Sequence, residues 1–161
     1  MDIQTATQAD GDALWAMLEP VFRAGETYPI DRDIAREDAL AYWLAPGHRT
    51  YLARSGGRAQ GTYYLRANNG GGGAHVCNCG YVVARYAQGR GVARRMAEHS
   101  FIEARGAGYS AMQFNFVIAS NHRALRLWVS LGFATVGRLP RAFAHPAGGR
   151  VDAFVMSRDL H

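Results

Sequence analysis

A chain of 161 residues has the length of one domain and can bury about 70% of the surface that its unfolded form exposes. Hydrophobic residues make up 48% of the chain and charged residues 19%, a globular composition that excludes intrinsic disorder. The formal net charge is +5 and all 18 basic residues are arginine, so the absence of lysine excludes lysine Schiff-base chemistry and a P-loop.

Hydrophobic periodicity and turn residues predict a series of helices and strands along the chain. Residues 3–5 form a first strand, and residues 9–24 form a helix that Pro20 breaks or kinks. Asp33 caps a second helix, which ends before Pro46. The other elements are strands at 49–54, 59–66 and 75–84, a helix at 91–105, a strand at 110–118, a helix at 121–131 that Ser120 caps, and strands at 133–138 and 150–157.

This order of elements, β-α-α-β-β-β-α-β-α-β-β, is typical of an α/β domain. The hairpins must be antiparallel and the strand-helix-strand passages parallel, which predicts a mixed sheet of about six to seven strands flanked by about four helices. The glycine-rich stretch 68–73 is a flexible loop inside the domain, and no proline-rich linker divides the chain. We therefore expect a single domain over residues 1–161.

The segment most informative about function is the turn between the strand at 75–84 and the helix at 91–105. Gly89 and Gly91 allow backbone conformations and close approaches that other residues block. Unpaired N–H groups at the start of the helix, together with the helix dipole, favour an anion such as a pyrophosphate. A plain strand-to-helix turn is the alternative interpretation.

The sequence of this turn matches the motifs of two common nucleotide-binding folds poorly. A Rossmann fingerprint needs a third small residue where this chain has Arg94, and an acidic residue near 111–114, where there is none. A P-loop needs a lysine. The arginines are scattered from Arg23 to Arg158, which is weak support for nucleic acid and suits a small ligand with several phosphates equally well.

Two motifs carry a resemblance to a known family. Gln88-Gly89-Arg90-Gly91-Val92-Ala93 resembles the Gln/Arg-x-x-Gly-x-Gly/Ala signature of the GNAT N-acetyltransferase superfamily, whose element order is also similar. The segment 121–133, Asn-His-Arg-Ala-Leu-Arg-Leu-Trp-Val-Ser-Leu-Gly-Phe, resembles that family's Asn-x-x-Ala-x-x-Leu-Tyr-x-x-Leu-Gly-Phe helix and strand. The motifs stand in the family's order with a strand between them, so the resemblance covers essentially the full chain.

The resemblance implies an acetyl-CoA site and no metal. Backbone groups around Val83 would pair with the pantetheine arm like an added strand, and Asn121 would hydrogen-bond near the thioester. The pyrophosphate would rest on the backbone amides of Gln88, Gly89, Arg90, Gly91, Val92 and Ala93.

A narrower resemblance concerns the acceptor. Residues 61–65, 75–81 and 113–117 look like GNAT members that acetylate small cyclic amino acids of the azetidine-2-carboxylate type. In that subgroup, asparagines matching Asn78 and Asn115 contact the substrate. Both lie among mainly apolar strand residues, and a buried amide needs partners, so a satisfied structural amide is the alternative for each. Tyr28 would line the acceptor pocket or pack as a core aromatic.

The residues at the positions of the general acid and the general base differ from those of many GNAT members. Trp128 stands where many members have a tyrosine that protonates the thiolate, and an indole N–H donates a hydrogen bond without releasing a proton. No Asp or Glu lies between Asp38 and Glu98, so the central strands supply no carboxylate base. We expect Asn121, assisted by Trp128, to act at the thioester, while the amine's proton leaves through water. His75 would either relay this proton or be a solvated histidine at the start of its strand.

The sequence therefore predicts an acetyl-CoA-dependent N-acetyltransferase that acts directly on a small-molecule amine, such as an amino acid or a cyclic analogue. Cys77 and Cys79 lack a Cys-His motif for covalent catalysis, and they are too few for a four-cysteine zinc site. A catalytically inactive CoA-binding module is the alternative. We expect a cytoplasmic protein without signal peptide or membrane span that binds no nucleic acid, and strands after Pro140 that support a homodimer.

Overall fold

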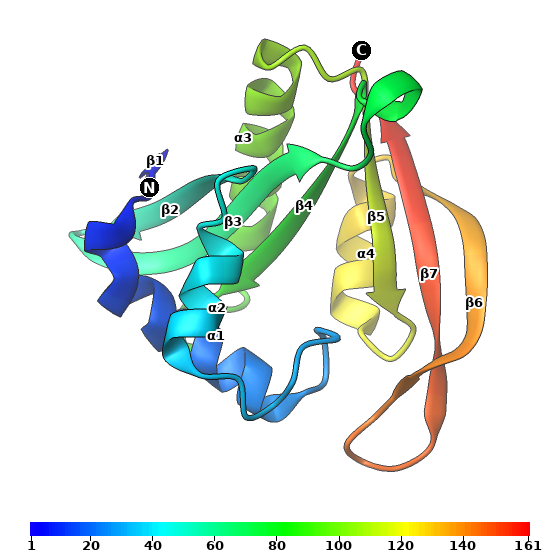
Figure 1. Cartoon of the computed structure of the whole chain (residues 1–161), viewed down its shortest axis with the longest axis horizontal. Helices are drawn as coiled ribbons and strands as arrows, with labels where there is room; N and C mark the ends of the chain where they lie inside the picture. Colours follow the sequence, from blue (N-terminus) through cyan, green and yellow to red (C-terminus); the bar gives the residue numbers. More distant parts are fainter.

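Seven strands form one mixed sheet in the computed structural model, which describes residues 1–161 (Figure 1). The strands are β1 (Asp2–Thr5), β2 (Arg49–Ser55), β3 (Arg58–Ala67), β4 (Val76–Val83), β5 (Ala111–Ile118), β6 (Ala134–Ala144) and β7 (Arg150–Asp159). The helices are α1 (Gly11–Ala24), α2 (Arg36–Trp43), α3 (Val92–Gly106) and α4 (His122–Ser130), with short 3-10 turns η1 (Gln8–Asp10), η2 (Gly71–Gly73) and η3 (Arg85–Ala87). The predicted α/β class, element order and mixed sheet are confirmed.

The order of strands across the sheet is β1-β2-β3-β4-β5-β7-β6, and only β4 and β5 are parallel neighbours. Their pairing covers only Val76 with Ala111 and Cys77 with Met112. Beyond these pairs the two strands diverge toward their carboxyl ends (Figure 1). The sheet is therefore open in its middle, between the two parallel strands that α3 connects.

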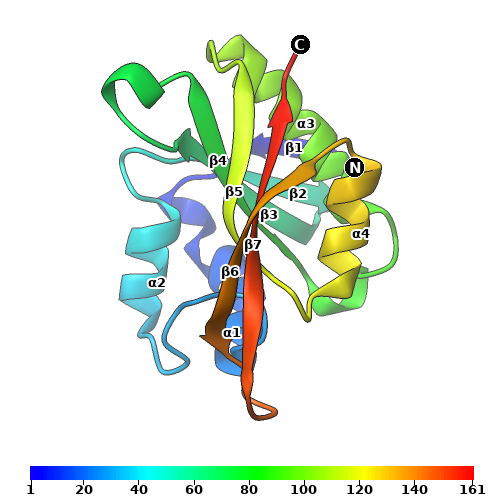
Figure 2. The same cartoon turned by 90° about the vertical axis from the view of Figure 1, so that its right-hand side faces the viewer.

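Helices cover both faces of the sheet, with α1 and α2 on one face and α3 and α4 on the other (Figure 2). Alternate residues of β3 separate the two faces, as the two-residue period of a strand requires. The Trp43 indole N–H of α2 donates to Thr62 Oγ1 at 3.0 Å on one face. Tyr63 meets His99 of α3 on the other face, through a hydrogen bond of 2.7 Å to His99 Nδ1. Side chains of β3 with even numbers therefore face α1 and α2.

The break considered at Pro20 and two predicted helix caps are wrong. Pro20 does not interrupt α1, because the buried side chains of Met17, Leu18 and Phe22 hold the helix against the core despite one lost backbone hydrogen bond. Helix α2 has no side-chain cap, since it begins after Ala35 rather than after Asp33. The residue that caps α4 is Asn121 instead of Ser120.

The last hairpin is longer than predicted, because β6 continues to Ala144 through two irregularities in its pairing with β7. Arg141, within the second irregularity, has a positive φ of 53°. Most of β6 is exposed at the edge of the sheet, so its burial pattern carries little of the alternation from which strands are predicted. No helix has the length and apolarity required to cross a membrane.

Candidate active site

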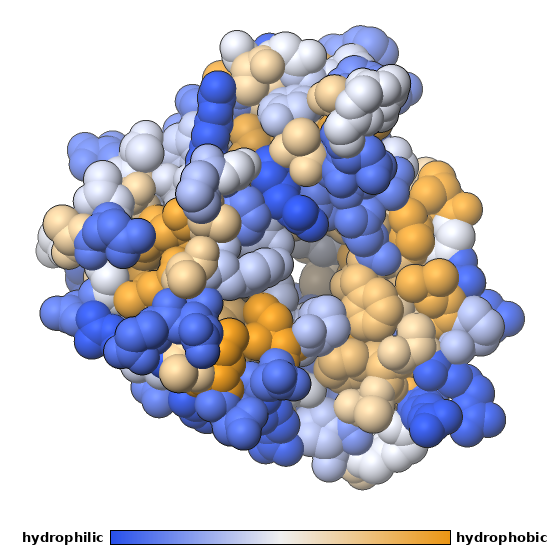
Figure 3. Space-filling view, viewed as in Figure 1, coloured by the Kyte–Doolittle hydropathy of each residue, from blue (hydrophilic) through white to orange (hydrophobic).

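The divergence of β4 and β5 opens into a cavity of about 760 Å³. Its walls come from β3, β4, β5, the first turns of α3 and α4, and the loop at 26–29 after α1. Figure 3 shows this face of the molecule with a hollow near its centre, bordered by both hydrophilic and hydrophobic surface. One continuous space therefore reaches from the glycine-rich turn to the face of the sheet that α1 and α2 cover.

The glycine-rich turn has the backbone geometry expected of an anion site. Gly89 and Gly91 both have a φ of 76°, in the left-handed region that L side chains rarely adopt. A Cβ added at either position would meet no protein atom within 4 Å, so the space beside both glycines is open. Gly91 is the N-cap of α3, and the first amides of this helix have no intrahelical partner. The geometry suits close approach of a ligand from outside the chain.

The structure brings most of the predicted cofactor residues together along this end of the cavity. Seven of them line the cavity, and these are Val83, Gln88, Gly89, Gly91, Val92, Ala93 and Asn121. Arg90 does not line the cavity and its side chain is exposed. Two arginines of the nearby helices line it as well, and each has a partner within the protein. Arg94 donates to Ser130 Oγ at 2.7 Å, and Arg123 donates to Gln88 Oε1 at 3.3 Å.

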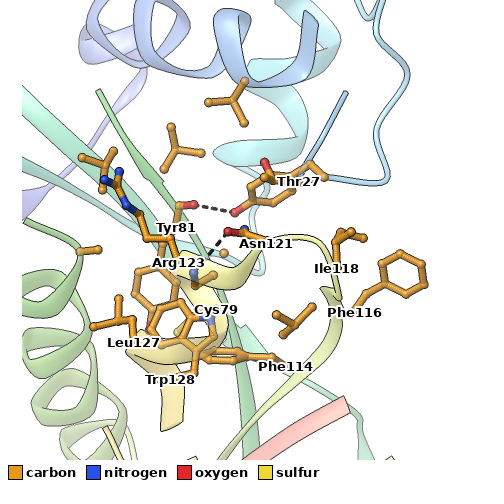
Figure 4. Close-up of a pocket in the computed structure, with 18 of the residues that line it drawn as sticks. Thr27, Cys79, Tyr81, Phe114, Phe116, Ile118, Asn121, Arg123, Leu127 and Trp128 are labelled. Carbon is orange, nitrogen blue, oxygen red and sulfur yellow. Dashed lines mark hydrogen bonds between the residues drawn. The ribbon is translucent and has the colours of Figure 1, made fainter. Parts of the chain in front are cut away.

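Asn121 lies just after the carboxyl end of β5 and begins helix α4. Its Oδ1 accepts a hydrogen bond of 3.2 Å from the backbone N–H of Ala124, which satisfies one of the free amides of the helix start. With Oδ1 engaged in the cap, the side-chain N–H groups of Asn121 remain available to the cavity that the residue lines. Figure 4 shows this side chain at the cavity with its bond to the helix start.

Trp128 is only 8% exposed and forms part of an aromatic floor (Figure 4). Its ring centroid lies 4.7 Å from that of Phe114 and 5.1 Å from that of Tyr81. The indole lines the cavity, and no hydrogen bond within the protein engages its N–H. It can therefore donate one hydrogen bond to a ligand.

Two asparagines line the opposite side of the cavity. Asn78 is buried, and its Nδ2 donates to the backbone oxygen of Gln113 at 2.8 Å. This side-chain bond follows the last backbone pair between β4 and β5, so Asn78 holds the two strands together where they begin to part. Its Oδ1 has no partner within the protein.

Asn115 is exposed, so the expectation that both amides are buried is wrong for this residue. No neighbouring strand covers this part of β5, because β4 has already diverged and a bulge follows Phe114 on the side of β7. The Asn115 amide accepts from Gln113 Nε2 at 3.0 Å and donates to Asn68 Oδ1 at 2.7 Å. Asn115 thus borders the mouth of the cavity.

Tyr28 combines the two roles considered from the sequence, since it lines the cavity and packs against the core. Its ring centroid lies 6.0 Å from that of Trp43, edge to face. Its hydroxyl donates to the backbone oxygen of Tyr81 at 2.9 Å, a bond that links the loop after α1 to β4 (Figure 4). Burial raises the pKa of Tyr28 above its ordinary value.

Two charged residues of the cavity carry no sequence motif and were not predicted. Glu26, in the loop after α1, is the one Asp or Glu that lines the cavity, and Arg66 lies near the end of β3. Side chains of a strand alternate between its two faces, so Arg66 shares a face with Thr62 and Tyr64. This alternation is the only sequence signal that could have placed Arg66 on the face of the sheet that carries the cavity. His75 is exposed and does not line the cavity, which agrees with a solvated histidine at the start of a strand rather than with a proton relay.

The cysteines do not have the properties of nucleophiles. Burial raises the pKa of the Cys77 thiol to about 12 and the pKa of the Cys79 thiol further. Both thiols are therefore protonated near neutral pH, whereas the thiolate is the reactive form. A covalent intermediate on either cysteine is disfavoured.

Comparison with known proteins identifies the family of this chain. The sequence model of the Acetyltransferase (GNAT) family matches residues 12–133. The solved structure of a GCN5-related N-acetyltransferase from Kribbella flavida is 36% identical, with a TM-score of 0.93 over 98% of this chain and 96% of that one. N-acetyltransferase aca1 of Schizosaccharomyces pombe is 28% identical over 150 residues, which cover 81% of this chain and 71% of the relative.

A third relative supports the fold. The structure of yncA, a putative acetyltransferase from Salmonella typhimurium with its cofactor acetyl-CoA, has a TM-score of 0.87 at 22% identity, over 100% of this chain and 94% of that one. The family match covers well over half of this chain and includes the glycine-rich turn, the Asn121 cap and the helix that carries Trp128. The chain belongs to the GNAT family of acetyltransferases, enzymes that use acetyl-CoA as co-substrate.

Proposed function

We propose that this protein transfers the acetyl group of acetyl-CoA directly to the amine of a small molecule, an amino acid or a cyclic analogue of one. The observation that carries the proposal is the single cavity that joins the glycine-rich turn to the polar pocket around Asn78. A thioester and an amine held in one cavity can react without a covalent enzyme intermediate, since proximity supplies much of the rate. The raised pKa values of the two cysteine thiols agree with direct transfer.

The cofactor would lie along the gap between β4 and β5. Its pyrophosphate would accept hydrogen bonds from the amides of Gln88–Ala93, and its pantetheine arm would pair with the free edge of β4 near Val83. This would direct the thioester toward Asn121 and Trp128, whose side-chain N–H groups would donate to its oxygen or to the departing sulfur. Arg90 would contribute its backbone amide alone.

Three tyrosines that line the cavity do not ionise within the working pH range. Burial raises the pKa values of Tyr28, Tyr64 and Tyr81 above the ordinary tyrosine value, so each keeps its proton through pH 10. A thiolate is a tolerable leaving group without a full general acid, because a thiol has a pKa of about 8.5. Water would take the proton of the amine.

The pH dependence follows from these pKa directions. We expect kcat/KM to rise about tenfold per pH unit below the pKa of the acceptor amine and then to remain level to about pH 10. Initial rates between pH 6 and pH 10, with the acceptor below its KM, measure this profile. A falling limb below pH 10 that disappears on changing Tyr28, Tyr64 or Tyr81 to phenylalanine would contradict the proposed chemistry.

The acceptor amine would be oriented by the polar groups opposite the turn. We expect Asn78→Ala and Asn115→Ala each to lower kcat/KM for the acceptor by a factor corresponding to about 1–3 kcal/mol, because a substrate group loses its partner. Steady-state kinetics with saturating acetyl-CoA give these values.

Two controls accompany this experiment. Asn69→Ala removes an exposed amide that does not line the cavity and should have no effect. Acetyl-CoA affinity should be nearly unchanged in Asn78→Ala, which verifies that β4 and β5 still diverge as before. Wild-type acceptor kinetics in both variants would exclude the resemblance to enzymes that acetylate azetidine-2-carboxylate.

Thiol release from acetyl-CoA across a panel of amines tests the proposed activity. The panel should contain amino acids, proline analogues, polyamines, aminoglycosides and peptide N-termini. Amine-dependent release supports the enzyme, and its absence with every amine, together with measurable CoA binding, identifies an inactive CoA-binding module. A homodimer supported by the strands after Pro140 stays a prediction, and so does a cytoplasmic location.

A further inference from the structure

Arg66 has a feature that no other residue of this chain shares. Its Nε is the one buried side-chain nitrogen or oxygen atom without a hydrogen-bond partner. No hydrogen bond within the protein involves its guanidinium, and no carboxylate oxygen lies within 4.0 Å of its nitrogens. A buried donor without a partner is costly, and a guanidinium carries five donors. Such a group calls for a partner that the chain does not supply.

The position of Arg66 indicates that its missing hydrogen-bond partner would lie in the cavity. Arg66 of β3 is the direct cross-strand partner of Asn78 of β4, and both line the cavity. Directly opposite residues of an antiparallel pair point to the same face, with Cβ atoms about 4.5–5.5 Å apart. The side chains of Arg66 and Asn78 therefore start from neighbouring points on one face of the sheet, and both line the cavity.

The partner is distinct from the phosphates of the cofactor. The other arginines of the cavity, Arg94 and Arg123, come from α3 and α4 beside the glycine-rich turn, and each has a hydrogen-bond partner in the protein. Arg66 comes from β3, on the face of the sheet that α1 and α2 cover. It is the only cationic side chain on that side of the cavity.

The surroundings of Arg66 indicate the size and character of the partner. Tyr64, two residues earlier on the same face, is bonded to the Tyr42 hydroxyl at 2.9 Å and stacked on His48 at 4.3 Å between ring centroids. Gly80 opposite Tyr64 is required, because a Cβ there would lie 2.6 Å from the Tyr64 ring. These contacts fix a rigid aromatic wall beside the guanidinium, which fits a small ligand with an apolar body.

We propose that Arg66 is the carboxylate anchor of the acceptor site and selects amines that carry a carboxylate. A guanidinium matches a carboxylate through two parallel hydrogen bonds, which gives both affinity and orientation. With the carboxylate on Arg66, the neighbouring Asn78 Oδ1 can accept a hydrogen bond from the amine. This inference rests on the proposed acetyl transfer and narrows its substrate to small amino acids.

The test compares each acid with its neutral amide. Thiol release from acetyl-CoA is measured with L-proline against L-prolinamide, and with L-alanine against L-alaninamide. We expect wild-type kcat/KM to favour the acids, and Arg66→Gln to lower it by about 10- to 100-fold for acids but less than about threefold for amides. Arg66→Lys should retain part of the preference for acids, since a lysine keeps the positive charge but cannot donate two parallel hydrogen bonds. Arg49→Gln, which removes an exposed arginine outside the cavity, should have no effect.

The outcomes separate this inference from the proposed function. Turnover without preference for acids, or an equal loss for acids and amides in Arg66→Gln, overturns the anchor while acetyl transfer stands. If no amine is acetylated, the proposed activity fails, and calorimetric titration of L-proline into the CoA-saturated protein tests the anchor alone. Binding that disappears in Arg66→Gln, is weakened but partly retained in Arg66→Lys and persists in Arg49→Gln supports it, and absence of binding overturns it.

Discussion

Replacing Asn121 by serine is expected to lower kcat by about 10- to 100-fold, as loss of a donor to the transition state does. The structure assigns two separate tasks to this side chain. Its Oδ1 caps α4 through Ala124, and its N–H groups are available to the cavity. Serine is an equally good N-cap but is too short to replace the amide donor, so this variant isolates the second task. Single-turnover acetyl transfer at saturating concentrations measures the effect.

Two companion variants make the result interpretable. Asn121→Asp keeps the cap and the shape of the side chain but replaces the N–H donors with oxygen, and it should show a similar loss. Asn121→Ala removes both the helix cap and the N–H donors. Because the cap is lost, this variant should also have a free energy of unfolding lower by about 0.5–2 kcal/mol, which thermal unfolding detects. Wild-type kcat in Asn121→Ser would mean that the amide is only a helix cap and that another group assists the thioester.

Gly91→Val is expected to reduce acetyl-CoA affinity at least tenfold, or about 1.4 kcal/mol, measured by calorimetry. A valine strains a backbone with a φ of 76°, and its methyl groups project into open space where the pyrophosphate would approach the amides. The two effects need to be separated, because strain alone could shift the turn.

Gly57 provides the matched control for this substitution. It has the same φ of 76° and the same open surroundings, but it lies in the turn between β2 and β3, away from the cavity. Gly57→Val should therefore show the strain in its unfolding temperature and keep wild-type affinity. Full affinity in a folded Gly91→Val protein would exclude the glycine-rich turn as the pyrophosphate site.

The backbone geometry at the proposed cofactor end could be predicted from the sequence because it is local. Gly89, Gly91 and Asn121 lie at the starts of two helices, where the backbone geometry and the motif belong to one continuous segment. The ends of α2 and α4 were harder to predict. Ser120 and Asn121 are both good caps, and only the tertiary fold decides which of two neighbours takes the position.

The acceptor end could not be predicted in full because it is assembled from separate segments. Arg66 becomes significant only through its register with Asn78 and through the lack of any partner, and neither is visible in a single strand. Glu26 comes from a loop with no motif. Asn115 is exposed because β4 has already diverged from β5 at this position, whereas the local sequence around Asn115 is mainly apolar.

The short pairing between β4 and β5 has a consequence for which molecules can enter. Past Cys77, the facing backbone groups of two strands form edges inside the sheet rather than at its rim. An ordinary exposed edge invites strands of other proteins. Here the first turns of α3 and α4 and the loop at 26–29 line the cavity beside these edges. The unpaired backbone groups therefore face a ligand-sized cavity inside the molecule rather than a surface on which a strand of another protein could pair.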